Sequence, residues 1–219
     1  PVFRSVLEAI DRAASEYADF SIIDELLADG LRSRLDRTQV LQVVLVAIQM
    51  ALGELWRTWG IEPDAVVGHS IGEIAAAFHA GILSLQDAIH IAVARGQYVA
   101  EIAAGRGAML AVSLPESMLL ERLGDAAQEL VIGAFNGPRS TVLSGPRPAI
   151  EQAENLLTQR GVRIRRLEID FAAHSPEMLA VLQPFGDAIV DIAPRVAKCP
   201  MVSTVLLEKL HGSECGPRY

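Results

Sequence analysis

A short apolar run, a glycine-bounded turn and a helix, in direct succession, most constrain how this chain can fold. Residues 63–67, Pro-Asp-Ala-Val-Val, end in β-branched side chains that favour a strand, and the strand pattern stops at Gly68. Helical spacing resumes at Ile71 and continues to Ala80, where Gly81 ends it. A strand followed by a tight turn and a helix is typical of α/β folds. We therefore expect an α/β protein in which helices pack on a sheet.

The N-terminal part of the chain predicts helices. Apolar residues recur at helical spacing within residues 1–28, and Gly30 marks a stop. Asp36-x-x-Gln39 has the pattern of a capping box, and from Val40 to Trp59 apolar side chains cover almost every helix face. This predicts a helix buried on all sides. We expect no bilayer span here, because the uncharged stretch Thr38–Gly53 is short and contains glutamines.

The pattern changes in the second half of the chain. Ser84-x-x-Asp87 is a further capping box and predicts another helix. Strand and helix patterns then alternate over residues 107–169 in the order βαββαβ, which is the signature of a ferredoxin-like unit. We expect a large subdomain of residues 1–106 and 170–219, with an inserted ferredoxin-like small subdomain of residues 107–169.

Composition excludes several classes of protein. The 219 residues are 51% hydrophobic and 21% charged, which supports a buried core and excludes a disordered chain. The net charge of −8 makes nucleic acid and membrane surfaces unexpected partners. Cys199 and Cys215 lack CxxC spacing and fit a reduced cytoplasmic protein. The chain starts at Pro1 without an initiator methionine, so we expect a segment of a longer polypeptide.

Gly68-His69-Ser70-Ile71-Gly72 is a G-x-S-x-G motif at the predicted turn. Between a strand and a helix, such a turn holds the serine exposed, as a nucleophile requires. The motif alone arises readily by chance, so the strand-turn-helix setting carries the prediction. The alternative is a purely structural βα turn. A serine hydroxyl is a weak nucleophile at neutral pH and needs a base within hydrogen-bond reach.

The candidate bases are the five histidines. His79 and His90 lie in predicted helices and are interpreted as structural, whereas His211 lies in an irregular tail and His69 is fixed beside the serine. His174 follows the last predicted strand of the small subdomain, where a loop is expected to face a cleft. It is a candidate base, with a plain loop histidine as an equal alternative. We find no metal-ligand motif and no P-loop.

Arginines supply two further candidates. Arg95 lies in an otherwise apolar stretch of the predicted helix that opens at Ser84, and a buried guanidinium needs an anionic partner. By chemistry alone, a protein carboxylate is favoured over a substrate carboxylate. Arg163, Arg165 and Arg166 form a basic strand, most simply a solvated sheet edge, with a docking patch for an acidic partner as the alternative.

The elbow with its next residue, Gly68-His69-Ser70-Ile71-Gly72-Glu73, resembles the GHSxGE motif of the acyltransferase domains of modular polyketide synthases. These domains are related to malonyl-CoA:acyl-carrier-protein transacylases. Further matching segments follow the same order: Leu35-Asp36-Arg37-Thr38 with Gln42, Trp56-x-x-Trp59-Gly60-Ile61-x-Pro63-Asp64, Gly107-Ala108-Met109, Asn136-Gly137-Pro138-x-Ser140 and Ser203-Thr204-Val205. The resemblance covers essentially the whole chain. It implies an α/β-hydrolase-like large subdomain, with the active site between it and the small one.

The resemblance also implies a reaction. Ser70 would be the acylated nucleophile, His174 the general base, and Arg95 the residue that binds the free carboxylate of an α-carboxyacyl group. The backbone N–H of Ile71 would supply one oxyanion donor. Acyl-coenzyme A would be the substrate, and the phosphopantetheine thiol of an acyl carrier protein the acceptor. Neighbouring synthase domains such as a ketosynthase are expected, and no bound cofactor or metal.

Selectivity between malonyl and methylmalonyl groups stays open. Of the residues implied to contact substrate, His69, Gln42, Phe171 and Ala173, the last two precede the histidine in Phe171-Ala172-Ala173-His174. That segment matches neither Tyr-Ala-Ser-His of methylmalonyl-selective members nor His-Ala-Phe-His of malonyl-selective ones. The small Ala173 favours room for an α-methyl group, whereas Ile71 stands where methylmalonyl-selective members often have glutamine.

The family's second oxyanion donor is a glutamine in a Gly-Gln-Gly segment upstream of the matched region. Its closing helices lie downstream, so we expect the chain to be incomplete at both ends.

Two alternatives compete with the acyltransferase. A serine esterase or thioesterase of the α/β-hydrolase type also uses G-x-S-x-G but usually needs an acid between serine and histidine in chain order. Asp87 and Asp125 are available, yet one lies in a predicted helix and the other near a helix end. An esterase would also leave Arg95 without a function. A non-catalytic docking module is disfavoured because Ser70 and His174 are both present.

Overall fold

The computed structural model describes residues 1–219, which divide into two compact units. Unit 1 comprises Pro1–Gln97 and Phe185–Tyr219, and unit 2 comprises Tyr98–Pro184. Unit 2 contains the whole predicted segment 107–169 and extends beyond it at both ends. The unit extends past residue 169 because a hydrogen bond from Ser144 Oγ to Ala173 O attaches the following segment to the sheet of unit 2.

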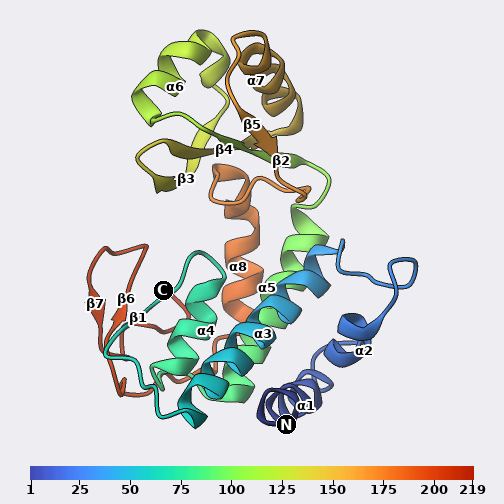
Figure 1. Cartoon of the computed structure of the whole chain (residues 1–219), viewed down its shortest axis with the longest axis vertical. Helices are drawn as coiled ribbons and strands as arrows, with labels where there is room; N and C mark the ends of the chain where they lie inside the picture. The colour runs from blue at the N-terminus through green and yellow to red at the C-terminus, as the bar shows by residue number, and fades with distance from the viewer. The chain divides into compact units, whose positions relative to one another are not determined.

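Unit 1 consists of helices and a small sheet (Figure 1). Its elements are α1 (Val2–Ala14), α2 (Ile22–Leu27), α3 (Thr38–Thr58), β1 (Val66–Val67), α4 (Gly72–His79), most of α5 (Leu85–Ile102), the end of α8 (Leu179–Ala188), β6 (Met201–Val202) and β7 (Lys209–Leu210). The strand order is β1-β6-β7, with β1 parallel to β6 and β6 antiparallel to β7. Both α1 and α4 pack against α3. The α/β class predicted from the sequence is confirmed.

Helix α3 departs from two predictions. It begins at Thr38 after Arg37 without a side-chain cap, so the capping box predicted at Asp36 does not form. The helix is also not buried on all sides, because neighbouring helices, among them α1, α2 and α4, cover only part of its surface. Its exposed apolar residues are Leu41, Leu45, Leu52 and Trp56, and Trp59, directly after its last turn, is exposed as well. By length and composition α3 could cross a membrane, contrary to our expectation, although a buried core helix passes the same test.

The capping box at the start of α5 is confirmed. The Asp87 N–H donates to Ser84 Oγ at 3.0 Å, and Ser84 Oγ donates in turn to Asp87 Oδ2 at 2.6 Å. The N–H of Ser84 donates to the same carboxylate oxygen at 3.3 Å. These reciprocal bonds satisfy N–H groups that would otherwise lack partners at the helix start. They fix the beginning of the helix that carries Arg95.

Unit 2 has the predicted βαββαβ order. Its elements are β2 (Gly107–Val112), α6 (Glu116–Leu123), η1 (Gly124–Ala127), β3 (Val131–Gly137), β4 (Ser140–Pro146), α7 (Arg147–Gln159), β5 (Ile164–Arg166) and η2 (Pro176–Met178). The sheet has the order β3-β4-β2-β5, and every neighbouring pair is antiparallel. Both α6 and α7 cover the same face of this sheet (Figure 1).

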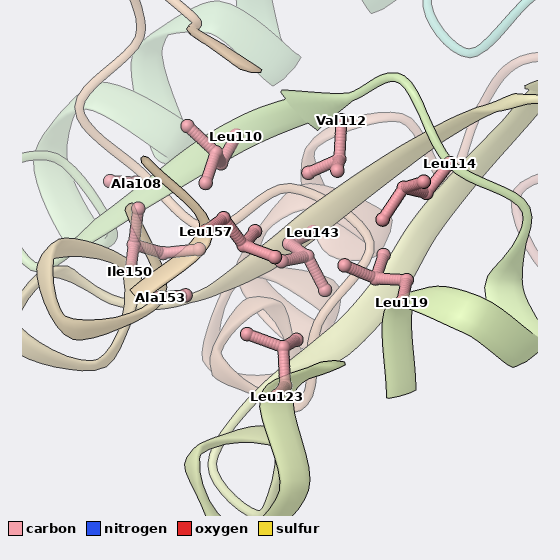
Figure 2. Close-up of a cluster of buried hydrophobic side chains, with 10 residues drawn as sticks. All are labelled: Ala108, Leu110, Val112, Leu114, Leu119, Leu123, Leu143, Ile150, Ala153 and Leu157. Atoms are coloured by element: carbon pink, nitrogen blue, oxygen red, sulfur yellow. The ribbon is translucent and has the colours of Figure 1, made fainter. Parts of the chain in front are cut away.

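Successive side chains of each strand point to opposite faces of the sheet, and the leucines of β2 and β4 point to the face that α6 and α7 cover. Leu110 and Leu143 of neighbouring strands point toward Leu119 of α6 and Leu157 of α7, and all four are buried (Figure 2). Side chains at odd positions of β2 and even positions of β4 point to the opposite face. Ser144, on that opposite face, contacts the loop that carries His174.

The basic strand is a sheet edge, as its simplest interpretation predicted. β5 pairs only with β2. Arg163 and Arg165 are exposed, whereas Arg166 turns toward α7 and pairs with Glu151 at 3.4 Å and Glu154 at 3.1 Å.

Candidate active site

The turn after β1 holds Ser70 in a left-handed backbone conformation. The φ angle of Ser70 is 53°, and only His174 (60°) and Leu207 (58°) share a positive φ among residues other than glycine. A side chain in this region costs of order 1–3 kcal/mol, and such residues cluster at functional sites. The two residues that the resemblance makes nucleophile and base are thus both strained. The strand-turn-helix setting predicted for the G-x-S-x-G motif is confirmed.

The flanking glycine explains how the turn can be so tight. A Cβ atom on Gly68 would lie 2.2 Å from the backbone nitrogen of Glu73. Only glycine therefore lets the end of β1 pass this close to the start of α4. The helix begins at once, because Gly72 N–H donates to His69 O at 3.0 Å and Glu73 N–H donates to Ser70 O at 2.9 Å.

The backbone amide of Ile71 lies at the N-terminal end of α4. The next amides, those of Gly72, Glu73 and Ile74, all donate to backbone carbonyls, whereas the Ile71 N–H has no backbone acceptor. N–H groups at a helix start lack intrahelical partners and point along the axis toward an incoming negative charge. The position is that required of an oxyanion donor next to Ser70.

Ser70 and Arg95 line one cavity of about 210 Å³ within unit 1. Apolar side chains of α4, α5 and α8 form most of its wall, together with Met201 of β6. Residues Cys215 and Tyr219 from the C-terminal part of the chain also line it. Burial raises the pKa of the Cys215 thiol to about 11 and that of the Tyr219 hydroxyl to about 12. Both groups are therefore protonated at neutral pH.

Arg95 has no carboxylate partner, so the internal ion pair favoured by chemistry alone is wrong. No acidic side chain lies within ion-pair distance of it. Its guanidinium Nη1 instead donates to the side-chain oxygen of Gln42, a buried residue of α3. Burial lowers the pKa of Arg95, because a partly desolvated cation loses the stabilisation of water. A cation in this state stabilises a bound anion strongly.

His174 lies in unit 2, in a loop that is held from several sides. Ser144 Oγ donates to Ala173 O at 2.6 Å, and Ser175 Oγ donates to Ala172 O at 2.7 Å. A Cβ atom on Gly107 would lie 2.3 Å from the nitrogen of Ala172, so the loop backbone rests directly on β2. His174 itself is exposed. The anchors on its preceding residues keep its backbone in the strained conformation.

The structure places the remaining predicted residues in two groups. Phe171 and Ala173 are buried beside His174 in unit 2. In unit 1, Gln42 contacts Arg95, whereas His69 lines a separate cavity of about 420 Å³ beside β1. No group of three or more histidine, cysteine, aspartate or glutamate side chains could hold a metal ion.

His79 and His90 are structural, as predicted. The His79 ring packs on Gly53, and its Nε2 is 3.2 Å from the backbone oxygen of Gln49. Burial lowers the pKa of His79, so it is neutral at pH 7. His90 stacks on Tyr17 with the ring centroids 4.4 Å apart.

Glu73 is the residue of this site that sequence reasoning missed. Its carboxylate is hydrogen-bonded to Thr204 and Tyr219, far along the chain. The available signal was its position directly after the G-x-S-x-G motif, together with the Ser203-Thr204-Val205 segment that matched the same family.

Comparisons with known proteins agree with this geometry. The family model for the acyl transferase domain matches residues 1–219. The erythronolide synthase EryA2 of Saccharopolyspora erythraea is 40% identical over 219 residues, which are 100% of this chain and 6% of that protein. The chain thus spans a small fraction of the length of the curated relatives it matches.

Solved structures agree as well. The acyltransferase domain from module 8 of the salinomycin polyketide synthase has a TM-score of 0.92 and 37% identity, over 100% of this chain and 52% of that one. The malonyl CoA-acyl carrier protein transacylase of Coxiella burnetii has a TM-score of 0.84 and 27% identity, over 96% of this chain and 68% of that one. The family match over the full length and the elbow at Ser70 lead to one conclusion: the chain belongs to the acyl transferase domain family.

Proposed function

We propose that this chain transfers an α-carboxyacyl group from acyl-coenzyme A to the phosphopantetheine thiol of an acyl carrier protein, through an ester on Ser70. One observation carries the proposal. Ser70, on its strained elbow, and Arg95, a half-buried cation without a carboxylate partner, line the same cavity. A malonyl-type group offers a carbonyl for the serine and a free carboxylate for the guanidinium, whose planar fork suits that anion.

The first half-reaction loads the enzyme. Ser70 Oγ attacks the thioester carbonyl carbon, the carbon–sulfur bond breaks, and coenzyme A leaves as a thiol. His174 takes the proton from Ser70 and gives it to the departing sulfur. The Ile71 N–H donates to the oxyanion that forms on the carbonyl oxygen, a contact that is strongest in the tetrahedral intermediate.

The second half-reaction unloads it. The carrier thiol attacks the ester carbon, and His174 takes the thiol proton. The bond from carbon to Ser70 Oγ then breaks, and the serine recovers its proton from His174. His174 is the proposed base because its loop is strained and anchored like the elbow, and because the helical histidines His79 and His90 have structural contacts.

For the acyl group we propose malonyl or methylmalonyl, with methylmalonyl accepted at least as well. The side chain of Ala173 is small and leaves room for an α-methyl group beside His174. One methyl group changes selectivity by about 1–3 kcal/mol, so this is a bias rather than an absolute choice.

We extend the proposal to the domain architecture and its setting. The parallel pair β1–β6 with its elbow supports an α/β-hydrolase-like large subdomain. The sheet order β3-β4-β2-β5 supports an inserted ferredoxin-like small one. Because similar proteins are polyketide synthases, we propose an acyl carrier protein and neighbouring domains such as a ketosynthase as partners, in the cytoplasm.

The test is transfer between two substrates. The protein is mixed with malonyl-CoA or methylmalonyl-CoA and a carrier protein bearing phosphopantetheine, and mass spectrometry follows the acyl-carrier product. The acylated form of the carrier protein should accumulate with wild type and with Ser113→Ala, which alters an exposed serine, but not with Ser70→Ala. Release of the free acid in place of the acylated carrier protein would indicate an esterase and contradict the proposal.

A further inference from the structure

The carboxylate of Glu73 is bonded through both oxygens to groups from the C-terminal part of the chain. Glu73 lies in the first turn of α4, three residues after Ser70. Its Oε1 accepts from Thr204 N at 2.8 Å and from Thr204 Oγ1 at 2.7 Å, and its Oε2 accepts from the Tyr219 hydroxyl at 3.0 Å. These bonds join the elbow helix to the segment that follows β6.

The network extends to a buried serine. The hydroxyl oxygens of Tyr219 and Ser203 are 2.7 Å apart, and Ser203 is 1% exposed. Ser203 Oγ already accepts from Val205 N at 3.1 Å and Leu206 N at 2.8 Å. Because a carboxylate can only accept, the protons balance when Ser203 O–H donates to Tyr219 and Tyr219 O–H donates to Glu73. Every hydroxyl proton then has an acceptor.

Glu73 thereby holds the elbow on both sides of the serine. Its backbone N–H donates to Ser70 O at 2.9 Å. Its side-chain partner Thr204 also lies against the start of the turn, with Oγ1 3.5 Å from Gly68 O. A residue with positive φ persists only when its surroundings over-determine it. The carboxylate network is such a constraint on Ser70.

We propose that Glu73 is a positioning residue, which keeps Ser70 Oγ and the Ile71 N–H in place for acyl transfer through its bonds to Thr204 and Tyr219. The role rests on the proposed acylation of Ser70. Although Glu73 lines the same cavity, it is not a general base, because both its oxygens are engaged.

The test separates positioning from folding. Glu73→Ala, Glu73→Gln and wild type are incubated with malonyl-CoA, and mass spectrometry gives both the final acylated fraction and the acylation rate per active site. In the matched control, Glu116→Gln, the changed glutamate also lies in the first turn of a helix but has an exposed side chain. We expect Glu73→Ala to reach the same final fraction with an unchanged KM, because Arg95 and its partner Gln42 are not altered. Its kcat for acylation should fall by about 10- to 100-fold, since small misplacements of reacting groups are costly.

Conservative variants sharpen the result. Glu73→Gln keeps an oxygen for Thr204 but presents an amide donor to Tyr219, so its rate should fall between those of Glu73→Ala and wild type. If Glu73→Ala does not fold, Thr204→Val and Tyr219→Phe each remove one hydroxyl of the network and should lower kcat with KM unchanged. A kcat equal to wild type in the folded variants would overturn the role of Glu73 alone. Absence of acylation in wild type would overturn the proposed function as well.

Discussion

Substituting Gly107 with alanine tests how the His174 loop is held in place. The added Cβ atom would lie 2.3 Å from Ala172 N, 2.6 Å from its Cβ and 2.8 Å from its Cα. Carbon atoms pack best at about 3.5–4.0 Å, so the loop or the strand must move by about 1 Å. Gly107 is paired with Pro146 in the sheet, and Ala172 is 1% exposed, so neither has free space to move into.

The expected cost follows from this overlap. Overpacking of a tightly packed site destabilises by about 1–3 kcal/mol. For a chain of this size that corresponds to a fall in Tm of about 2–12 °C. A displacement of about 1 Å at the His174 backbone should also slow acylation of Ser70 by about 100-fold. Calorimetry and the acylation rate measure the two effects independently.

The matched control is Gly137→Ala at the end of β3, in the same unit. Its Cβ atom would meet nothing closer than Ser140 Cβ at 4.0 Å, so stability and rate should stay near wild type. If Gly107→Ala melted and reacted like Gly137→Ala, the loop would not depend on this contact and the reasoning would be refuted.

Four further results are expected. Arg95→Ala should slow acylation by malonyl-CoA about 10- to 150-fold, the equivalent of about 1.5–3 kcal/mol for hydrogen bonds to a charged group, while acetyl-CoA is affected less; an equal loss with both donors would contradict carboxylate binding. Ala173→Phe should shift competition between methylmalonyl-CoA and malonyl-CoA toward malonyl, and an unchanged ratio would show that this side chain does not set the choice. His174→Ala should slow acylation by about 10²- to 10⁴-fold, and a rate like that of wild type would place the base elsewhere. Burial lowers the pKa of His79 below its usual value of 6.5, so the unfolded chain takes up this proton first and stability falls as the pH decreases below 6.5. In urea unfolding compared between about pH 8 and about pH 5.5, on either side of that value, His79→Gln should lose less stability than wild type, and an equal loss would refute this linkage.

Local patterns in the sequence predicted the features that depend on neighbouring residues. The capping box of Ser84 and Asp87 formed, since its partners are three residues apart. The βαββαβ order of unit 2 was readable because the apolar period changes between strands and helices. The elbow at Ser70 was readable for a similar reason, since its glycines adjoin the serine.

The exact start of one helix, and features that depend on distant residues, were missed. The predicted cap at Asp36 failed because the helix begins one position later than the pattern implies. The exposed side of α3 could not be distinguished from its buried side, since both are apolar. Arg95 contacts Gln42 of another helix, and Glu73 of α4 contacts Thr204 in the turn after β6; no local spacing encodes either contact.

Acylation of Ser70 is the central claim, and identifying the modified residue tests it most directly. The protein is incubated separately with malonyl-CoA, methylmalonyl-CoA and acetyl-CoA, and the acyl group is located by intact mass and peptide mapping. We expect one acyl group per chain, on the peptide that contains Ser70, with either α-carboxyacyl donor, and weaker labelling by acetyl-CoA. An acyl group on a different residue, or a folded protein that remains unmodified by all three donors, would contradict the account.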